Sequence, residues 1–250
     1  MNMLHALKNT LYQLKLTAWM IFTYPKSKLR AEHANYDMYW KEKRQDEVVV
    51  LSSWQKNRAD LVLDCLRGEK DAPLYVGDIG CGDGAMLQYL KENMPSLRAV
   101  GYDISTLTLK RAAEAGIEVR ELDIRKDEEL SKLTAVDYYF LFEVLEHVPA
   151  AEKVLAAAYA RASKGVLFSV PNSGYFAYRL RLLFGKFPLQ WVTYPTEHLR
   201  FWTGRDMDWW LTAQEYPRFT VRYYKGVPLL NRLFPRLFAM GMFVHLKKTA

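Results

Sequence analysis

Three glycines at alternate positions follow an apolar, β-branched run and precede a helical pattern. Gly80, Gly82 and Gly84 come after residues 74–79, and Leu87 and Leu90 continue beyond them at helical spacing. This order predicts a strand, a tight turn and a helix. Glycines let the backbone approach a ligand closely, and the first N–H groups of a helix point at it with the positive end of the helix dipole. The turn therefore predicts a site for a nucleotide-like ligand with an anionic group.

Three aspartates stand at or beside the carboxyl ends of predicted strands. Asp78 precedes the first glycine by two residues, Asp103 ends a strand over 98–102, and Asp123 ends a strand over 117–122. Each could merely cap a turn, but three at successive strand ends indicate one ligand. The glycines alone would also satisfy the dinucleotide pattern G-x-G-x-x-G/A, which leaves a dinucleotide enzyme as an alternative.

With these motifs, residues 74–171 resemble the class I S-adenosylmethionine-dependent methyltransferases. The resemblance implies that Asp103 accepts hydrogen bonds from both ribose hydroxyls and Asp123 one from the adenine amino group. It also implies that the glycine loop and Asp78 hold the methionine half, whose cationic sulfonium favours acidic and aromatic walls. The cofactor-binding residues expected on this basis are Asp78, Gly80, Cys81, Gly82, Gly84, Asp103, Ile104, Asp123, Ile124, Glu143, Val144, Tyr39, Trp40 and Arg58, with Tyr39 and Trp40 in a lid.

A fourth buried run, 135–142, leads into the sequence E-x-x-E-H-V-P at 143–149. In the resembling family this loop lines the junction between methyl donor and acceptor, and its form is similar to the ubiquinone-type O-methyltransferases. Glu143 would contact the cofactor, and His147 is the first candidate for a base. The alternative for His147 is a helix-start residue bonded to a neighbour. His198, in a loop before a helix capped by Thr203, is the second candidate base. No metal site is expected.

These residues require a sheet that brings the strand ends together. Strands are predicted over 74–79, 98–102, 117–122, 135–142, 165–170, 218–224 and 239–246. The expected fold is α/β, a Rossmann-like, seven-stranded, mostly parallel sheet with helices on both faces and the last strand antiparallel beside the fifth. We expect residues 1–70 to form an N-terminal helical extension and lid, and residues 71–250 the methyltransferase domain, with 173–217 inserted as a substrate cap.

The cap is predicted from a change in composition after Ser173. Residues 173–217 interleave aromatic side chains with arginines and lysines, which no cofactor chemistry requires. Nucleic-acid binding would also use such residues, but no RNA-binding motif is present, and we expect no nucleic-acid partner. Part of this region is similar to the MetW-like proteins, although the E-x-x-E-H loop and the long N-terminal segment depart from that family.

Residues 4–22 form an amphipathic pattern with leucines at three- and four-residue spacing and lysines on another face. Lys15 interrupts the apolar run, so it is neither a secretory signal nor a spanning helix. The helix could dock on the body, pair with a second copy, or lie on a membrane surface.

Net charge is distributed unevenly. The chain carries +7 overall, with +5 in residues 1–45, −6 in 46–175 and +8 in 176–250. Basic ends around an acidic core suggest an anionic acceptor, an anionic membrane or an acidic partner, although solvated basic faces explain them as well. Only two cysteines occur, which indicates a reducing cytoplasm and no disulfide framework.

The sequence thus predicts methyl transfer from S-adenosylmethionine to an oxygen, or less favourably a nitrogen, of a small aromatic, amphipathic or anionic acceptor. The alternative is a non-catalytic, MetW-like protein that binds the cofactor and regulates another enzyme. Cytoplasmic location is expected, with peripheral membrane contact if the first helix lies on lipid.

Overall fold

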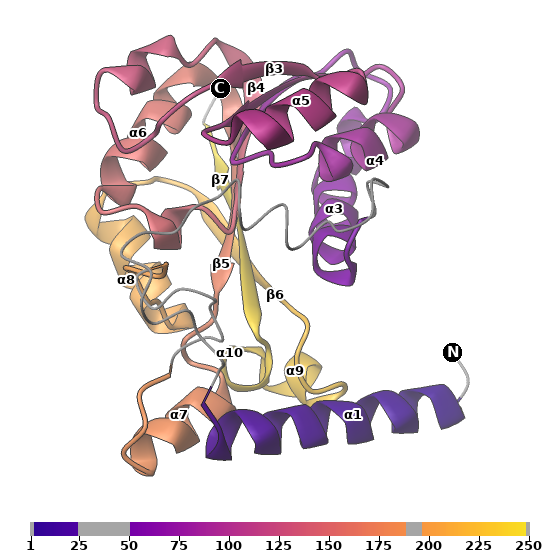
Figure 1. The fold of residues 1–250 in the computed structure, drawn as a ribbon, viewed down its shortest axis with the longest axis vertical. Coiled ribbons are helices and arrows are strands. Elements are labelled where there is room, and N and C mark those ends of the chain that lie inside the picture. Colours follow the sequence, from indigo (N-terminus) through magenta and orange to yellow (C-terminus); the bar gives the residue numbers. More distant parts are fainter. Residues whose placement is uncertain (1–2, 25–50, 189–196, 249–250) are drawn as a thin grey trace.

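The computed structural model of the chain describes residues 3–24, 51–188 and 197–248 (Figure 1). Its centre is one seven-stranded sheet in the order β3-β2-β1-β4-β5-β7-β6. Neighbouring strands are parallel, except that β7 runs antiparallel to both β5 and β6. The predicted mostly parallel α/β sheet is confirmed, together with the antiparallel last strand beside the fifth. The strands are β1 (Tyr75–Ile79), β2 (Arg98–Asp103), β3 (Glu118–Glu121), β4 (Val136–Phe142), β5 (Ala162–Pro171), β6 (Phe219–Tyr224) and β7 (Gly241–Lys247).

Helices cover both faces of the sheet, as predicted. On one face α3 (Ser53–Cys65), α4 (Ala85–Asn93) and α5 (Thr106–Glu114) bury their apolar sides in a shared core. On the other face α6 (Ala151–Arg161) and α8 (Gly204–Ala213) do the same. Because β1 to β4 are parallel, their carboxyl ends lie at one edge between these two layers. Three short 3-10 turns complete this part: η1 (Arg67–Glu69), η2 (Glu129–Lys132) and η3 (Leu145–His147).

Local sequence explains where the flanking helices begin. Thr203 caps α8 as predicted, since its hydroxyl accepts from the Asp206 N–H while the Asp206 carboxylate accepts from the Thr203 N–H. Ser52 and Gln55 cap α3 in the same reciprocal way. β5 starts at Ala162, directly after α6, which is three residues earlier than the sequence pattern predicts. A register shift in its pairing with β4, between Val136 and Tyr138, accommodates the extra residues.

A separate helical layer lies at the end of the molecule where β5 stops (Figure 1). α1 (Met3–Phe22) packs against α7 (Phe176–Leu183), and α9 (Leu230–Leu233) and α10 (Pro235–Phe238) lie beside them. Arg181 of α7 is fully buried, and its guanidinium group donates to the carbonyl oxygens of Met20 and Thr23 at the end of α1. These are carbonyls that a helix terminus leaves without an internal partner. α1 therefore docks on the body, one of the three arrangements that the sequence leaves open.

Candidate active site

A cavity of about 510 Å³ lies at the carboxyl ends of β1 to β4. Its wall comes from the loops after these four strands, from the first turns of α3, and from Glu197 and His198 ahead of α8. Side chains from distant parts of the sequence thus meet at the edge of a parallel sheet, where α/β folds bind their ligands.

The glycine loop after β1 has the backbone shape that the sequence predicts. Gly80 has φ +77° and Gly82 φ +55°, a region that favours glycine. A Cβ atom on Gly80 would lie 2.6 Å from Cγ2 of Val144, in the loop after β4. Only glycine lets these two loops pack together. Gly80, Cys81, Gly82 and Val144 all line the cavity.

Asp103 at the end of β2 is held in place by the backbone. Its Oδ2 accepts from the Gly82 N–H at 2.9 Å, and its Oδ1 accepts from the Ser105 N–H at 2.9 Å. The carboxylate lies on the cavity wall beside Ile104. A carboxylate oxygen has two lone pairs, so each can accept from a ligand's hydroxyl in addition to a backbone N–H.

Asp123, after β3, also lines the cavity, together with Ile124. Arg125 donates to both of its oxygens, from Nε at 2.8 Å and Nη2 at 2.9 Å. This hydrogen bonding and charge lower the pKa of the Asp123 carboxyl, so it stays ionised. A carboxylate in this state accepts a hydrogen bond from an amino group such as that of adenine.

Glu143, the first residue after β4, joins four elements. Its Oε1 accepts from Ser169 Oγ at 2.8 Å and from the Tyr224 hydroxyl at 3.1 Å, and it lies 3.7 Å from Arg58 Nη1. Ser169 belongs to β5, Tyr224 to β6 and Arg58 to α3. Glu143 and Arg58, both expected to bind the cofactor, line the cavity.

Two residues expected to bind the cofactor lie off the described cavity wall. Asp78 is buried within β1, and Gly84 (φ +75°) forms the N-cap of α4. Burial, and next the negative charge of Asp103, raise the pKa of Asp78 to about 8. Asp78 is therefore mostly protonated at neutral pH. Tyr39 and Trp40, the expected lid residues, lie outside the described part of the chain.

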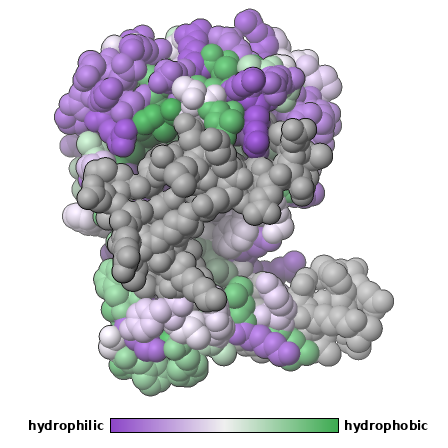
Figure 2. All heavy atoms as spheres, in the orientation of Figure 1, coloured by the Kyte–Doolittle hydropathy of each residue, from purple (hydrophilic) through white to green (hydrophobic). Residues whose placement is uncertain are grey.

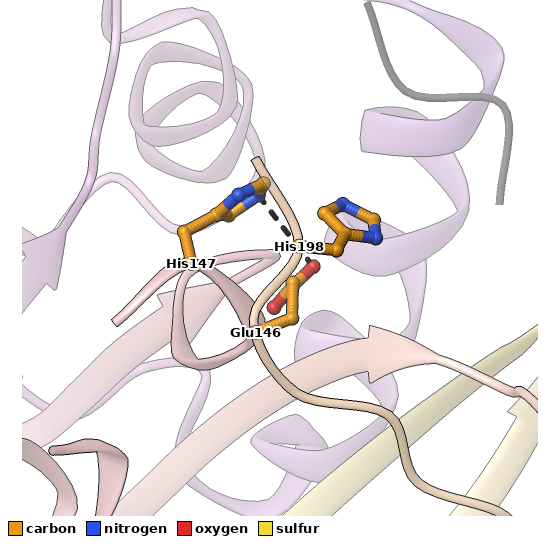
Figure 3. A group of neighbouring side chains, drawn as sticks. All are labelled: Glu146, His147 and His198. Carbon is orange, nitrogen blue, oxygen red and sulfur yellow. Dashed lines mark ion pairs between the residues drawn. The ribbon is translucent and has the colours of Figure 1, made fainter. Parts of the chain in front are cut away.

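The loop after β4 and the segment before α8 bring three side chains together: Glu146, His147 and His198 (Figure 3). The two imidazole rings lie 4.7 Å apart between centroids, at 69°. His147 Nε2 is 3.9 Å from Glu146 Oε1, and its Nδ1 lies 2.7 Å from the carbonyl oxygen of Glu197. Burial, and next the neighbouring His147, lower the pKa of His198 to about 3, so its ring is neutral. The structure thus brings both predicted bases into one group.

Backbone contacts lock this group together. The N–H groups of Leu199 and Arg200 both donate to the carbonyl oxygen of Glu146, at 2.8 and 3.2 Å. The Arg200 guanidinium group forms a two-bond pair with Glu152 at the start of α6, at 2.7 and 2.8 Å. His198 is therefore fixed against Glu146 and His147, although it is distant from them in sequence.

Comparisons with known proteins agree with this geometry. Residues 50–216, more than half of the chain, match a family model described as a methyltransferase domain. The chain belongs to the class I S-adenosylmethionine-dependent methyltransferases. No curated protein sequence matches the chain.

The solved structures similar to this methyltransferase support the same fold. One is a SAM-dependent methyltransferase from Archaeoglobus fulgidus, 17% identical, with TM-score 0.56, covering 86% of this chain and 100% of its own. Another is magnesium protoporphyrin IX methyltransferase from Synechocystis with bound S-adenosylhomocysteine, 16% identical, with TM-score 0.57, covering 86% and 98%. A third is a Thermotoga maritima methyltransferase described as a possible histamine N-methyltransferase, 16% identical, with TM-score 0.55, covering 85% and 94%.

The cofactor of this methyltransferase is S-adenosylmethionine. The cavity fits that group, because it offers a close glycine backbone and two ionisable carboxyls at the ends of β2 and β3. When bound, the cofactor supplies an activated methyl group on a sulfonium. Asp103 and Asp123 would hold its nucleoside part, and the loop from Gly80 to Gly82 the remainder.

Several cavity residues were missing from the sequence prediction. Trp54, at the start of α3, lines the cavity and packs edge-on against Tyr224, with ring centroids 5.7 Å apart. Glu146 lies in the E-x-x-E-H pattern and His198 is a candidate base, but the sequence does not predict that the two meet, because the contact is long-range. Conversely, Trp202 and Trp210, expected in a substrate cap, pack in the core, Trp210 as a residue of α8 itself. Tyr175 and Tyr178 pack against α1. From 173–217, only Glu197 and His198 reach the cavity among the described residues.

Asp103→Ala should weaken binding of S-adenosylhomocysteine by roughly 10- to 100-fold, because hydrogen bonds to a charged group contribute about 1.5–3 kcal/mol. Isothermal titration calorimetry measures this directly. Glu121→Ala is the matched control, since Glu121 is the exposed acid that pairs with Asp103 in register on β3 and lies off the cavity wall. Equal affinity in the two variants would remove Asp103 from the cofactor site.

Asp78→Asn should be more stable than the parent protein, by an amount that grows with pH. A carboxyl with a native pKa of about 8 keeps a proton that the unfolded chain, near 3.8, has released. The parent's unfolding free energy therefore falls as pH rises from about 4 to 8, by up to about 1.4 kcal/mol per pH unit. Asparagine cannot ionise, so urea unfolding at pH 5 and pH 8 should show a widening gap. A constant gap would mean that Asp78 is ionised in the native protein.

Proposed function

We propose that this methyltransferase methylates an oxygen of a small acceptor, with the group of Glu146, His147 and His198 handling the acceptor's proton. The observation that supports this is the position of the group in the cavity wall. Glu146 and His147 follow β4, whereas Asp103 and Asp123 follow β2 and β3, and the strand order places β1 with its glycine loop between them. The acceptor would therefore lie on the β4 side of the cofactor.

The presence of this group favours a hydroxyl acceptor over an amine, because an unprotonated amine can be methylated without a base. A hydroxyl keeps its proton at neutral pH, and a base placed beside it makes the oxygen a better nucleophile. His198 is neutral, and although a ring with a pKa of about 3 is a weak base, it can accept the strongly acidic proton that an oxygen carries once its bond to the methyl group forms. His147 is held by its bond to the Glu197 carbonyl. The protein's other contributions are alignment of the reactants and exclusion of water.

We further infer the division of the chain that the sequence suggests: an N-terminal extension over 1–70 and a methyltransferase domain over 71–250. Within it, residues 173–217 would form the acceptor side. The contribution of His198 to the cavity supports this assignment. The acceptor would be aromatic, amphipathic or anionic, and Trp54 and Phe142 give the cavity an aromatic part of its wall.

His198→Ala should slow methylation by about 100-fold or more, while binding of S-adenosylhomocysteine stays unchanged. The measurement uses cofactor with an isotope-labelled methyl group, incubated with the full chain and with lipid and aqueous cell extracts, and follows the label by mass spectrometry. Phe201→Ala, an exposed aromatic residue close in sequence, is the matched control. If no extract is labelled and a stoichiometric protein partner co-purifies instead, the chain is a non-catalytic, MetW-like cofactor-binding partner.

We also infer that the protein works in the cytoplasm against an anionic membrane surface. No described helix is long and apolar enough to cross a membrane. Large apolar side chains are nevertheless exposed on the layer of α1, α7 and α9. Figure 2 shows hydrophobic residues gathered at the lower left of this layer. The exposed set, the apolar layer, is Leu11, Tyr12, Trp19, Phe22, Tyr24, Leu182, Leu183, Phe184, Phe187, Leu229, Leu233 and Phe234.

The charged residues around the apolar layer indicate which kind of surface it would contact. The segments 3–24, 175–188 and 225–240 contain no aspartate or glutamate, whereas Lys15, Arg232 and Arg236 are exposed within them. Thr17, Met20 and Ile21 of α1 face the body, and its exposed side carries Lys15 among large apolar residues such as Trp19 and Phe22. Asp208 of α8 pairs with Arg236 at 2.7 Å, which leaves Lys15 and Arg232 as the cations beside the apolar side chains. Apolar residues mixed with cations match the interface of an anionic bilayer.

The double variant Phe22→Glu and Leu183→Glu should bind anionic vesicles more than about 10-fold more weakly, because it replaces two apolar side chains with charges. Co-sedimentation with phosphatidylglycerol vesicles measures this, and added salt should weaken the parent's binding. Trp209→Glu on α8 is the control, since Trp209 is 70% exposed outside the apolar layer.

Equal pelleting of the double variant and the parent would exclude the apolar layer as the membrane contact. Analytical ultracentrifugation of the same proteins tests the second arrangement. A dimer that the double variant dissociates, without vesicle binding by the parent, would show that the layer pairs with a second copy instead.

A further inference from the structure

We propose that Glu146, His147 and His198 bind a divalent transition-metal cation. One ligand atom from each residue, a carboxylate oxygen and two ring nitrogens, lies within 4.8 Å of the others (Figure 3). No other such group of three occurs among the described residues. The site's role in methylation rests on the proposed function, but its existence does not.

The hydrogen bond of His147 sets which of its nitrogens can bind a metal. Nδ1 lies 2.7 Å from the carbonyl oxygen of Glu197, and a carbonyl can only accept, so Nδ1 carries the hydrogen. In the neutral ring, Nε2 then presents a lone pair toward Glu146 Oε1. Metal-binding histidines typically donate their other ring N–H to a backbone carbonyl or a carboxylate in this way.

The two facing atoms of Glu146 and His147 are not hydrogen-bonded to each other. Their separation of 3.9 Å is too long for a hydrogen bond. Two ligand atoms that each lie about 2 Å from a tetrahedral cation are about 3.3 Å apart, so a side-chain shift of roughly half an ångström would bring this pair to ligand distance.

Glu146 supplies the second, independent observation. Its side chain is 0% exposed, and neither carboxylate oxygen has a hydrogen-bond partner among the described residues. The Arg58 guanidinium group forms its ion pair with Glu143, in the same loop. A buried carboxylate without donors is strongly unfavourable, and a cation between it and two imidazoles would offset that cost.

The ligand set is also rigid before any cation arrives. Glu146 and His147 share the 3-10 turn η3, and the bonds from Leu199 and Arg200 to the Glu146 carbonyl fix His198 beside them. Arg200 is anchored in turn by Glu152, which also accepts from Trp210 Nε1 at 2.8 Å. Little ordering would remain to oppose binding.

The chemistry of the ligands selects the kind of cation. Two imidazoles and one carboxylate suit Zn²⁺, Co²⁺, Fe²⁺ or Mn²⁺, whereas Mg²⁺ and Ca²⁺ prefer oxygen ligands. Three protein ligands leave coordination positions open, and all three residues border the cavity. A bound cation would occupy the lone pairs that these side chains otherwise offer to a proton, so the group would then act through the cation, which would lower the pKa of an acceptor hydroxyl and let the proton pass to solvent.

Cobalt titration of the full chain tests the proposal. Protein cleared of metal with a chelator, which is then removed, should develop visible d–d absorption as Co²⁺ is added, saturating at one cation per chain. Zn²⁺ should abolish these bands. His198→Ala and Glu146→Gln should each weaken Co²⁺ binding by more than about 10-fold, whereas His5→Gln in α1 should bind like the parent.

Each variant is also tested for S-adenosylhomocysteine binding and thermal unfolding, so that misfolding is recognised. If Glu146→Gln fails to fold, the half-buried His198 still carries the test. Absence of d–d bands in the parent, or equal Co²⁺ affinity in His198→Ala, would overturn the metal site. Intense near-ultraviolet bands of thiolate ligation would do so too, by placing the cation at Cys65 or Cys81.

If S-adenosylhomocysteine still binds to a protein that fails to bind Co²⁺, the metal site is overturned and the proposed methyl transfer is not. Co²⁺ binding without cofactor binding would instead support the metal site and overturn the proposed methyl transfer.

Discussion

The cavity depends on a turn that the chain makes at Glu143. This residue has φ +57°, a left-handed conformation that costs a residue other than glycine about 1–2 kcal/mol. Hydrogen bonds from Ser169 and Tyr224 to its carboxylate, with Arg58 close by, offset that cost. The turn redirects the chain at the end of β4, so that Glu146 and His147 follow along the cavity rather than away from it. One carboxylate thereby sets the relative positions of β4, β5, β6 and α3.

The same turn is coupled to the cofactor loop. Val144, the next residue, packs where a side chain on Gly80 would otherwise lie, and Asp103 holds the Gly82 N–H from the neighbouring strand. The loop after β1 is therefore held in place by the loop after β4 on one side and by the end of β2 on the other. A change in any of them would move both the cofactor side and the acceptor side of the cavity. This explains how a methyl donor and an acceptor can be aligned by loops rather than by secondary structure.

Most of the fold could be predicted from the sequence because its signals are local. Strand periods, the glycine turn and acids at strand ends are each visible within a few residues, and parallel pairing then brings Asp103 and Asp123 to one edge. The group around Glu146 could not be predicted, because His198 reaches it through backbone bonds formed only after folding. The aromatic residues after Ser173 suggested a substrate cap for a related reason. Their composition indicates that these aromatic side chains are covered, but it does not show whether a bound ligand or the protein core covers them. Trp202 and Trp210 are covered by the core.

Two glutamates in one loop illustrate the difference between a structural and a reactive carboxylate. Glu143 has donors from two strands and a nearby guanidinium group, so its charge is balanced within the protein. Glu146 is fully buried, and burial, with Glu143 next, raises the pKa of its carboxyl. The described residues give it a neighbouring imidazole but no hydrogen-bond donor. Its charge must therefore be balanced by something that arrives at the cavity, either a proton or a cation. The fold thus balances the charge of one carboxylate within the protein and leaves that of the next to a group that enters the cavity.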